Sequence, residues 1–382
     1  MGMLSSRRMA IGAVLVAAAA TVFQDNIAGF AGHMTIDKAG KLQQWAGSGP
    51  FNNGACVVEA STNACEDVFV HAASGTVFVA CGDPRGRTLW FPPAGPRNAK
   101  AREEAGGFRE HLFKHNIAAG TTTELRLEGV EGDFVTHGID VWSSPTDPSL
   151  VHIFAVRHTR AGDAISIFSH TLGTDTATLI RNVRHARIRA ANGVAAVGPF
   201  DFYMTNDHYF VSQPWRTLEE KFGPWTWATD VQYCDAADEA AVHCKTVAGP
   251  YPAANGIAVW EDRLFVGDSQ IGTMRVFQQR PDHGVDFVSQ VELGAAADNI
   301  KVDPSTGDLV LASKELRMPA GALRISKASG YTTTELLYHD DGGVLSEMTA
   351  MALDPVHNVL VGAAFLQYGG FAVCKMGHTR SV

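Results

Sequence analysis

Short polar segments precede apolar alternating stretches at several places in this chain. Five of them share this pattern closely: Glu66-Asp67-Val68, His137-Gly138-Ile139, Asn192-Gly193-Val194, Asn255-Gly256-Ile257 and Asp298-Asn299-Ile300. A sixth, Thr349-Ala350-Met351, fits the same position more loosely. Carboxylate and carboxamide oxygens are the ligands that hard cations prefer, so these segments would form a calcium site if they converged.

The elements that follow these segments indicate how they could converge. Each segment leads into the alternation typical of a β-strand, such as Ile257-Ala258-Val259 or Ile300-Lys301-Val302. The segments recur about every 50 residues, a period that suits four-stranded propeller blades with variable loops. The innermost strands of a propeller begin around a central channel. We therefore predict an all-β, six-bladed β-propeller with a calcium-binding tunnel.

Composition excludes some classes of protein. The chain has 382 residues, 46% of them hydrophobic and 19% charged, which is a globular composition. The repeated β pattern predicts one large domain over residues 56–382. The formal net charge of −9 argues against a nucleic-acid partner, and we expect a small-molecule partner instead. The oligomeric state is left open.

The N-terminal region carries a hydrophobic segment. Arg7 and Arg8 precede an uncharged run from Met9 to Phe23. Residues 1–23 are predicted to be either a cleaved signal peptide or a retained membrane anchor, and residues 24–55 an N-terminal extension. Both alternatives predict a secreted or otherwise extracytoplasmic protein.

The six cysteines are even in number, which is consistent with export and oxidation. Cys65 and Cys81 flank a predicted hairpin, and Cys234 and Cys244 bracket a second one. These pairings leave Cys56 and Cys374, near the two ends of the folded region, as a closing bridge. The alternative is that some of the cysteines are free and buried.

A set of motifs, kept in order from about Cys56 to Cys374, resembles the paraoxonase/arylesterase family. The motifs are Glu66-Asp67, Thr136-His137-Gly138-Ile139, Thr205-Asn206-Asp207-His208-Tyr209-Phe210, Ala254-Asn255-Gly256-Ile257 and Asp298-Asn299-Ile300. The resemblance implies a six-bladed propeller with two calcium ions in its tunnel. It also implies hydrolysis of lactones and aryl esters, and an N-terminal hydrophobic segment that is often retained.

The resemblance assigns the ligands of both ions. The catalytic calcium would be held by Glu66, Asn192, Asn255, Asp298 and Asn299. The structural calcium would use Asp67 and the main-chain carbonyl of Ile139. A further carboxylate of the family falls on Gly193, so a charged ligand is missing and the choice between one ion and two stays open.

The resemblance also assigns the catalytic histidines. His137 would deprotonate the attacking water, and His158 would orient His137 or relay the proton. Without the resemblance, a channel-lining structural role for His137 is equally compatible with the sequence. His208 is expected to be structural and paired with Asp207. Thr159, Ser313 and Lys314 depart from the family pattern, so substrate preference is not carried over.

Three functions therefore remain at the level of sequence. The first is a calcium-dependent lactonase or arylesterase. The second is a related propeller hydrolase of sugar lactones or phosphotriesters. The third is a non-catalytic, membrane-associated propeller that binds or chaperones partner proteins. A serine hydrolase has no support, because no Gly-x-Ser-x-Gly motif occurs.

Overall fold

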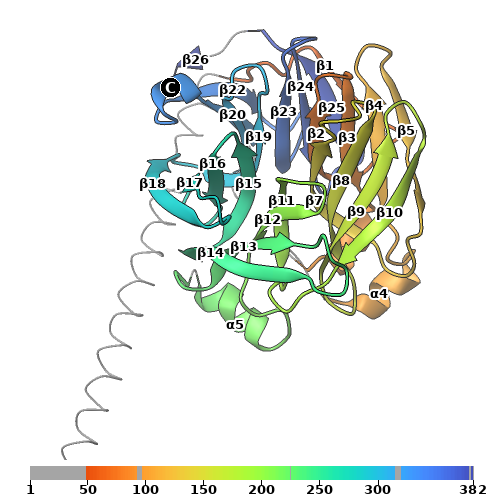
Figure 1. The fold of residues 1–382 in the computed structure, drawn as a ribbon. Helices are drawn as coiled ribbons and strands as arrows, with labels where there is room; N and C mark the ends of the chain where they lie inside the picture. The colour runs from red at the N-terminus through yellow and green to blue at the C-terminus, as the bar shows by residue number, and fades with distance from the viewer. Residues whose placement is uncertain (1–48, 93–96, 224, 315–319, 378–379, 382) are drawn as a thin grey trace, which may run out of the picture.

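The computed structural model describes residues 49–92, 97–223, 225–314, 320–377 and 380–381. In these residues the strands form six sheets of four or five strands, arranged around one axis (Figure 1). The protein is thus a six-bladed β-propeller, and the predicted fold class is confirmed.

The first three blades follow one another along the chain. Blade 1 contains, from the axis outward, β2 (Cys65–His71), β3 (Thr76–Cys81), β4 (His111–Asn116) and β5 (Thr121–Glu124). Blade 2 contains β7 (Val135–Ser143), β8 (Leu150–His158), β9 (Ala164–Thr171), β10 (Thr176–Val183) and β6 (Arg126–Glu128). Blade 3 contains β11 (Ala191–Ala196), β12 (Asp201–Asn206), β13 (Thr229–Asp235) and β14 (His243–Tyr251).

The second half of the ring repeats this order and then closes on the first. Blade 4 contains β15 (Ala254–Trp260), β16 (Arg263–Asp268), β17 (Thr273–Gln279) and β18 (Val285–Glu292). Blade 5 contains β19 (Ala296–Val302), β20 (Leu309–Lys314), β21 (Ala320–Ile325), β22 (Thr334–Asp340) and β26 (Arg380–Ser381). Blade 6 contains β23 (Met348–Asp354), β24 (Val359–Ala364), β25 (Phe371–Lys375) and β1 (Cys56–Val58).

Blade 6 joins the two ends of the propeller. Its outermost strand, β1, pairs antiparallel with β25, and Cys56 lies opposite Cys374. A disulfide links these two residues across 318 positions of sequence. The other two bonds, Cys65–Cys81 and Cys234–Cys244, also match the pairing that the spacing suggested, and no cysteine is free.

The hydrophobic core lies between neighbouring blades. Phe78 of blade 1 and Phe168 of blade 2 belong to one cluster of buried side chains, and Phe154 and Phe202 join blades 2 and 3 in the next. The remaining blade pairs share similar clusters. Because each sheet is covered on both faces, its strands carry long apolar runs.

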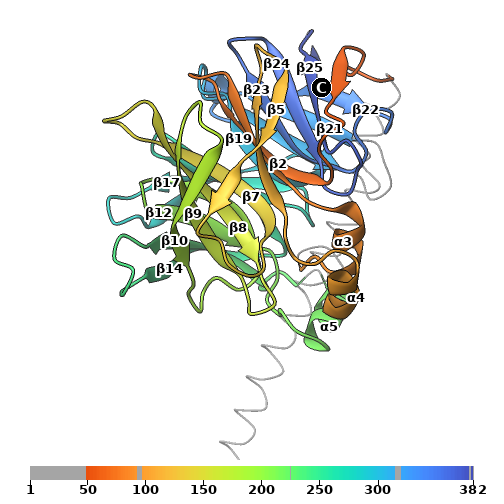
Figure 2. The same cartoon turned by 90° about the vertical axis from the view of Figure 1, so that its right-hand side faces the viewer.

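Short helices gather at one end of the propeller (Figure 2). They are α3 (Pro84–Leu89), α4 (Ala99–Glu104) and α5 (Trp215–Phe222), with the 3₁₀ turn η1 (Lys327–Ser329) elsewhere. α3 follows β3 and α5 follows β12, both of which end where the innermost strands begin, and α4 contacts α3, so the three helices lie at the tunnel mouth. No helix within the described ranges is long and apolar enough to cross a membrane. The predicted signal or anchor, residues 1–23, lies outside those ranges, as do residues 24–48 of the predicted extension.

Candidate functional site

The six polar segments all lie at the start of innermost strands, and each coincides with an irregularity of the sheet. The pairing register between the innermost strand and its neighbour shifts at this position in every blade, for example between Cys65 and Asp67 and between Ala297 and Ile300. A β-bulge re-aims the side chains next to it. The repeated bulge therefore turns each segment towards the axis.

Glycines in the middle of three of the segments allow the innermost strands to approach one another. A Cβ atom on Gly138 would lie 2.4 Å from the carbonyl oxygen of Asn192, and one on Gly256 would lie 2.2 Å from that of Asp298. Both distances are too short for any side chain. The glycine that follows the polar residue is therefore required by close backbone packing, not by turn conformation.

Side chains from different blades meet at the level of Glu66. Asn299 donates from Nδ2 to Glu66 Oε1 at 3.0 Å, and Thr349 donates from Oγ1 to the main-chain carbonyl of Glu66 at 2.7 Å. Asn192 donates from Nδ2 to Asp207 Oδ2 at 3.2 Å, which leaves its amide oxygen directed elsewhere. These contacts orient the segments of blades 1, 3, 5 and 6.

Three oxygens at this level have no hydrogen-bond partner among the described residues. Glu66 Oε2, Asn192 Oδ1 and Asn255 Oδ1 are all buried. An unsatisfied buried polar atom is costly, and a bound cation would remove that cost. The described part of the chain brings together no group of three His, Cys, Asp or Glu residues that could hold a metal ion, so a cation here would also need amide oxygens. Carboxylates combined with amides fit a hard ion such as calcium.

The ligands predicted for the deeper, structural calcium already have hydrogen-bond partners, unlike the oxygens at the level of Glu66. Asp67 accepts hydrogen bonds from the main-chain nitrogens of Val68 and Ile139. The ammonium of Lys301 contacts both predicted ligands, Asp67 Oδ2 at 2.7 Å and the carbonyl oxygen of Ile139 at 3.0 Å. The ligands predicted for a structural calcium are therefore already bonded to an internal cation and do not fit a second ion.

A chain of hydrogen bonds links two histidines to the mouth. His158 Nδ1 lies 2.8 Å from Asp163 Oδ1, His158 Nε2 lies 3.1 Å from His137 Nδ1, and His137 Nε2 lies 3.2 Å from Glu66 Oε1. Because the carboxylate of Asp163 can only accept, His158 carries its proton on Nδ1. His158 Nε2 then accepts from His137, which leaves His137 Nε2 as the basic nitrogen.

The electrostatics of this level follow from two opposed effects. Burial raises the pKa of Glu66, but His137 and the nearby Arg87 outweigh it and hold that pKa below its ordinary value. Burial lowers the pKa of His137, but the carboxylate of Glu66 outweighs it and raises that pKa. Without a bound cation, the pair is therefore stabilised as carboxylate and imidazolium.

The pKa values of the neighbouring carboxyls move in opposite directions. Asp207 is buried, but the His208 imidazole 2.8 Å away and Arg216 hold its pKa well below the usual range. The expected Asp207–His208 pair is thus present. Burial raises the pKa of Asp67 to about 7, and Lys301 opposes this rise.

A buried ion cluster supports the rim of the mouth. Arg87 from α3 and Arg102 from α4 both pair with Glu110, at 2.7 and 2.8 Å. Arg87 also lies over the ring of Phe91 at 4.8 Å from its centroid. Phe91 in turn packs edge-on against His137 and His158, with centroids 5.1 and 5.7 Å apart. The cluster therefore fixes an apolar wall beside both histidines.

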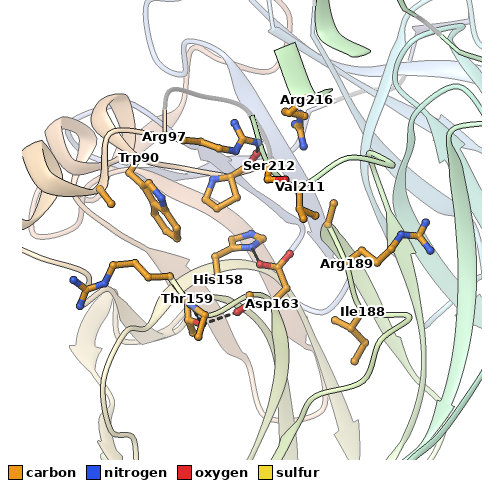
Figure 3. Close-up of a pocket in the computed structure, with 16 residues that line it drawn as sticks. Trp90, Arg97, His158, Thr159, Asp163, Ile188, Arg189, Val211, Ser212 and Arg216 are labelled. Carbon is orange, nitrogen blue, oxygen red and sulfur yellow. Dashed lines mark hydrogen bonds and ion pairs between the residues drawn. The ribbon is translucent and has the colours of Figure 1, made fainter. Parts of the chain in front are cut away.

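A pocket of about 650 Å³ opens beside the histidine pair (Figure 3). His158 and Asp163 lie among its lining residues, joined by their hydrogen bond, and Trp90, Ile188 and Val211 supply apolar surface. Arginines complete the lining: Arg97, Arg160, Arg189 and Arg216. The pocket is large enough for a small organic substrate and reaches His158, which bonds His137.

Asp163 and Lys301 are the two residues of the site that sequence reasoning missed. Asp163 lies in the turn after β8, and no feature of its sequence distinguishes it from an ordinary turn aspartate. The sequence does mark Lys301, because it is a charged residue between Ile300 and Val302 in the apolar part of its innermost strand. A charged residue at this position predicts a carboxylate partner on another innermost strand, which is Asp67.

Comparisons with known proteins agree with this geometry. The model of the family described as Arylesterase matches residues 110–368. The chain is 31% identical over 202 residues to serum paraoxonase/arylesterase 2 of Gallus gallus, covering 52% of this chain and 54% of that protein. It is 26% identical over 327 residues to serum paraoxonase/lactonase 3 of Oryctolagus cuniculus, covering 81% and 86%.

The matches differ in extent. The chain spans about half the length of the paraoxonase/arylesterase 2 relatives that it matches. Among solved structures, a luciferin-regenerating enzyme has a similar fold, with a TM-score of 0.51 at 12% identity over 87% of this chain and 98% of that one. The family model covers well over half of the chain, and the residues that it matches include both histidines. The chain therefore belongs to the arylesterase family.

Proposed function

We propose that this protein is a calcium-dependent hydrolase of lactones and aryl esters. The observation that carries the proposal is the group of buried, unpartnered oxygens on Glu66, Asn192 and Asn255, with His137 Nε2 beside the Glu66 carboxylate. The names of the relatives, paraoxonase/arylesterase and paraoxonase/lactonase, support the same reaction class.

The residues at the tunnel mouth would hold one calcium ion. They are Glu66, Asn192, Asn255, Asp298 and Asn299, of which two are carboxylates that balance the charge of one divalent cation. When bound, calcium polarises the ester or lactone carbonyl and stabilises the oxyanion that develops on it. Asn299 and Thr349 contribute by fixing the position of Glu66 through their hydrogen bonds.

His137 is the proposed general base. Its Nε2 faces Glu66, which stabilises the imidazolium as long as the carboxylate has no other cation beside it. A cation held by Glu66 would offset the charge of that carboxylate and favour the neutral imidazole, whose Nε2 would accept a proton from water. Attack of that water on the carbonyl carbon, followed by expulsion of the alcohol or phenol oxygen as it takes the proton back from His137, would complete the hydrolysis.

His158 and Asp163 act as positioning residues. Asp163 accepts the proton on His158 Nδ1 and is itself held by the main-chain nitrogen of Ala191 at 2.9 Å. His158 then presents Nε2 to His137 Nδ1, which fixes the orientation of that ring. As positive charge develops on His137, the buried carboxylate of Asp163, at the far end of this hydrogen-bonded series, stabilises it.

The pocket beside the histidines is the proposed substrate site. Its apolar wall of Trp90, Ile188 and Val211 suits the hydrocarbon part of an aryl ester or alkyl lactone. The three disulfides are typical of an oxidising compartment, so we propose an extracytoplasmic protein.

Hydrolysis of phenyl acetate and of neutral and carboxylate-bearing γ- and δ-lactones, with and without a calcium chelator, tests the proposal. We expect turnover that disappears on chelation and returns when calcium is restored. A folded, calcium-loaded protein without turnover on any of these substrates would instead support the binding function. Turnover unaffected by chelation would contradict the metal mechanism.

A further inference from the structure

The tunnel contains a cation that belongs to the chain itself. Lys301 lies on β19, and its ammonium reaches across to β2 and β7, where it bonds Asp67 Oδ2 and the carbonyl oxygen of Ile139. The side chain of Lys301 is 11% exposed and that of Asp67 is 2% exposed. This contact therefore pairs two charges inside the tunnel, one layer below Glu66.

Below this layer the tunnel becomes largely apolar. A cavity of about 190 Å³ is lined by residues from all six innermost strands, and Lys301 and Asp140 are its charged members. Asp140 is held by the main-chain nitrogen of Ala196 at 2.7 Å. Lys301 contacts Asp67 from this cavity, and without that ammonium the buried Asp67 carboxylate would lose its cationic partner at a large cost in free energy.

The backbone explains why a further acidic ligand is missing at this depth. A Cβ atom on Gly193 would lie 2.9 Å from the carbonyl oxygen of Asn255 and 3.0 Å from Ile257 Cγ2. The Thr205 hydroxyl fixes that carbonyl by donating a hydrogen bond to it at 2.6 Å. The same hydroxyl accepts a hydrogen bond from the main-chain nitrogen of Gly193 at 2.9 Å. No side chain fits at residue 193 unless the backbone moves.

We infer that Lys301 is a built-in replacement for a second metal ion, so that the protein holds one divalent cation, at the mouth, and none between Asp67 and Ile139. Charge accounting agrees with this assignment. Of the three carboxylates in the polar segments, Asp67 is neutralised by Lys301. Glu66 and Asp298 then carry the two negative charges that balance one calcium ion.

Calcium stoichiometry and thermal unfolding test the inference without relying on activity. We expect the wild-type protein to bind one calcium per chain in equilibrium dialysis. Lys301→Met removes the cationic partner of the buried Asp67 carboxyl, so Tm in chelator should fall by roughly 10 °C. A second, weaker calcium should bind in the millimolar range and restore part of that loss. Two calcium ions on the wild type, or no second ion on Lys301→Met, would overturn the inference.

A double-mutant cycle keeps the test decisive if Lys301→Met folds poorly. Adding Asp67→Asn removes the unpaired charge, so the double variant should regain most of the lost Tm and bind a single calcium. Failure of Asp67→Asn to restore Tm would show that the two charges are not coupled.

Lys114→Met is the matched control, because Lys114 also contacts a carboxylate, Asp175 at 2.7 Å, and main-chain carbonyls, but on the surface. Its Tm should change little.

The inference rests on the proposed function only for the ion at the mouth. If that site binds no calcium, the wild-type stoichiometry falls to zero. The coupling between Lys301 and Asp67 can still be measured by thermal unfolding in chelator. Failure of the proposed function and failure of this inference are therefore distinguishable.

Discussion

Glu66 and Asp67 are neighbours in sequence, yet they belong to two different levels of the tunnel. At the upper level, Glu66 Oε2 and two amide oxygens are buried without a partner. At the lower level, Asp67 is fully bonded to two main-chain nitrogens and to Lys301. The upper level requires a ligand from outside the chain, whereas the lower level is complete. One β-bulge therefore directs adjacent carboxylates to a functional task and to a structural one.

The largest effect should come from exchanging one carboxylate at each level. Glu66→Gln removes a charged ligand while keeping the shape, so we expect kcat/KM to fall by about 10³-fold and calcium affinity to fall with it. Asp67→Asn should leave kcat/KM within about threefold and lower Tm instead, because Lys301 loses its partner. Steady-state kinetics and calcium titration of both variants give the comparison. Equal losses of activity would contradict the division into two levels.

His137→Gln separates catalysis from metal binding within the upper level. Removal of a general base should lower kcat by about 10²-fold or more, while calcium affinity stays within about twofold of wild type. His170→Gln is a suitable control, since His170 is also buried but bonds only the carbonyl of Thr176 in blade 2. Kinetics on phenyl acetate check both variants. A His137→Gln variant with unchanged kcat would make this histidine structural.

Gly193→Ala should have the smallest effect, and it tests why the lower level lacks another oxygen. The added methyl group meets the carbonyl of Asn255, so we expect a loss of about 2 kcal/mol in unfolding free energy. Gly54→Ala, where no atom lies within 4 Å of the new methyl group, should lose much less. Chemical denaturation of both variants measures the difference. Equal stabilities would show that the backbone at residue 193 moves easily.

The contrast between levels also shows what could be predicted from the sequence. Each polar segment is a local motif in front of an alternating strand, so the six blades and the positions of His137, Asn192 and Asn255 were predictable. The partner of Asp67 was not, because Lys301 is 234 residues away and the contact depends on bringing blades 1 and 5 together around the axis. Asp163 was missed for a different reason. Its role depends on the direction of one side chain in a turn, which has no sequence pattern.

The seam in blade 6 has a consequence for how the protein is made. Its outer strand β1 is the first strand of the described residues, and its partner β25 lies near their end. During synthesis β1 emerges early and has no partner until nearly all of the propeller has been translated. An unpaired strand edge is a template for aggregation. A product that stops before β25 therefore keeps β1 unpaired and Cys56 free. A chain that includes β25 pairs it with β1 and forms the Cys56–Cys374 disulfide.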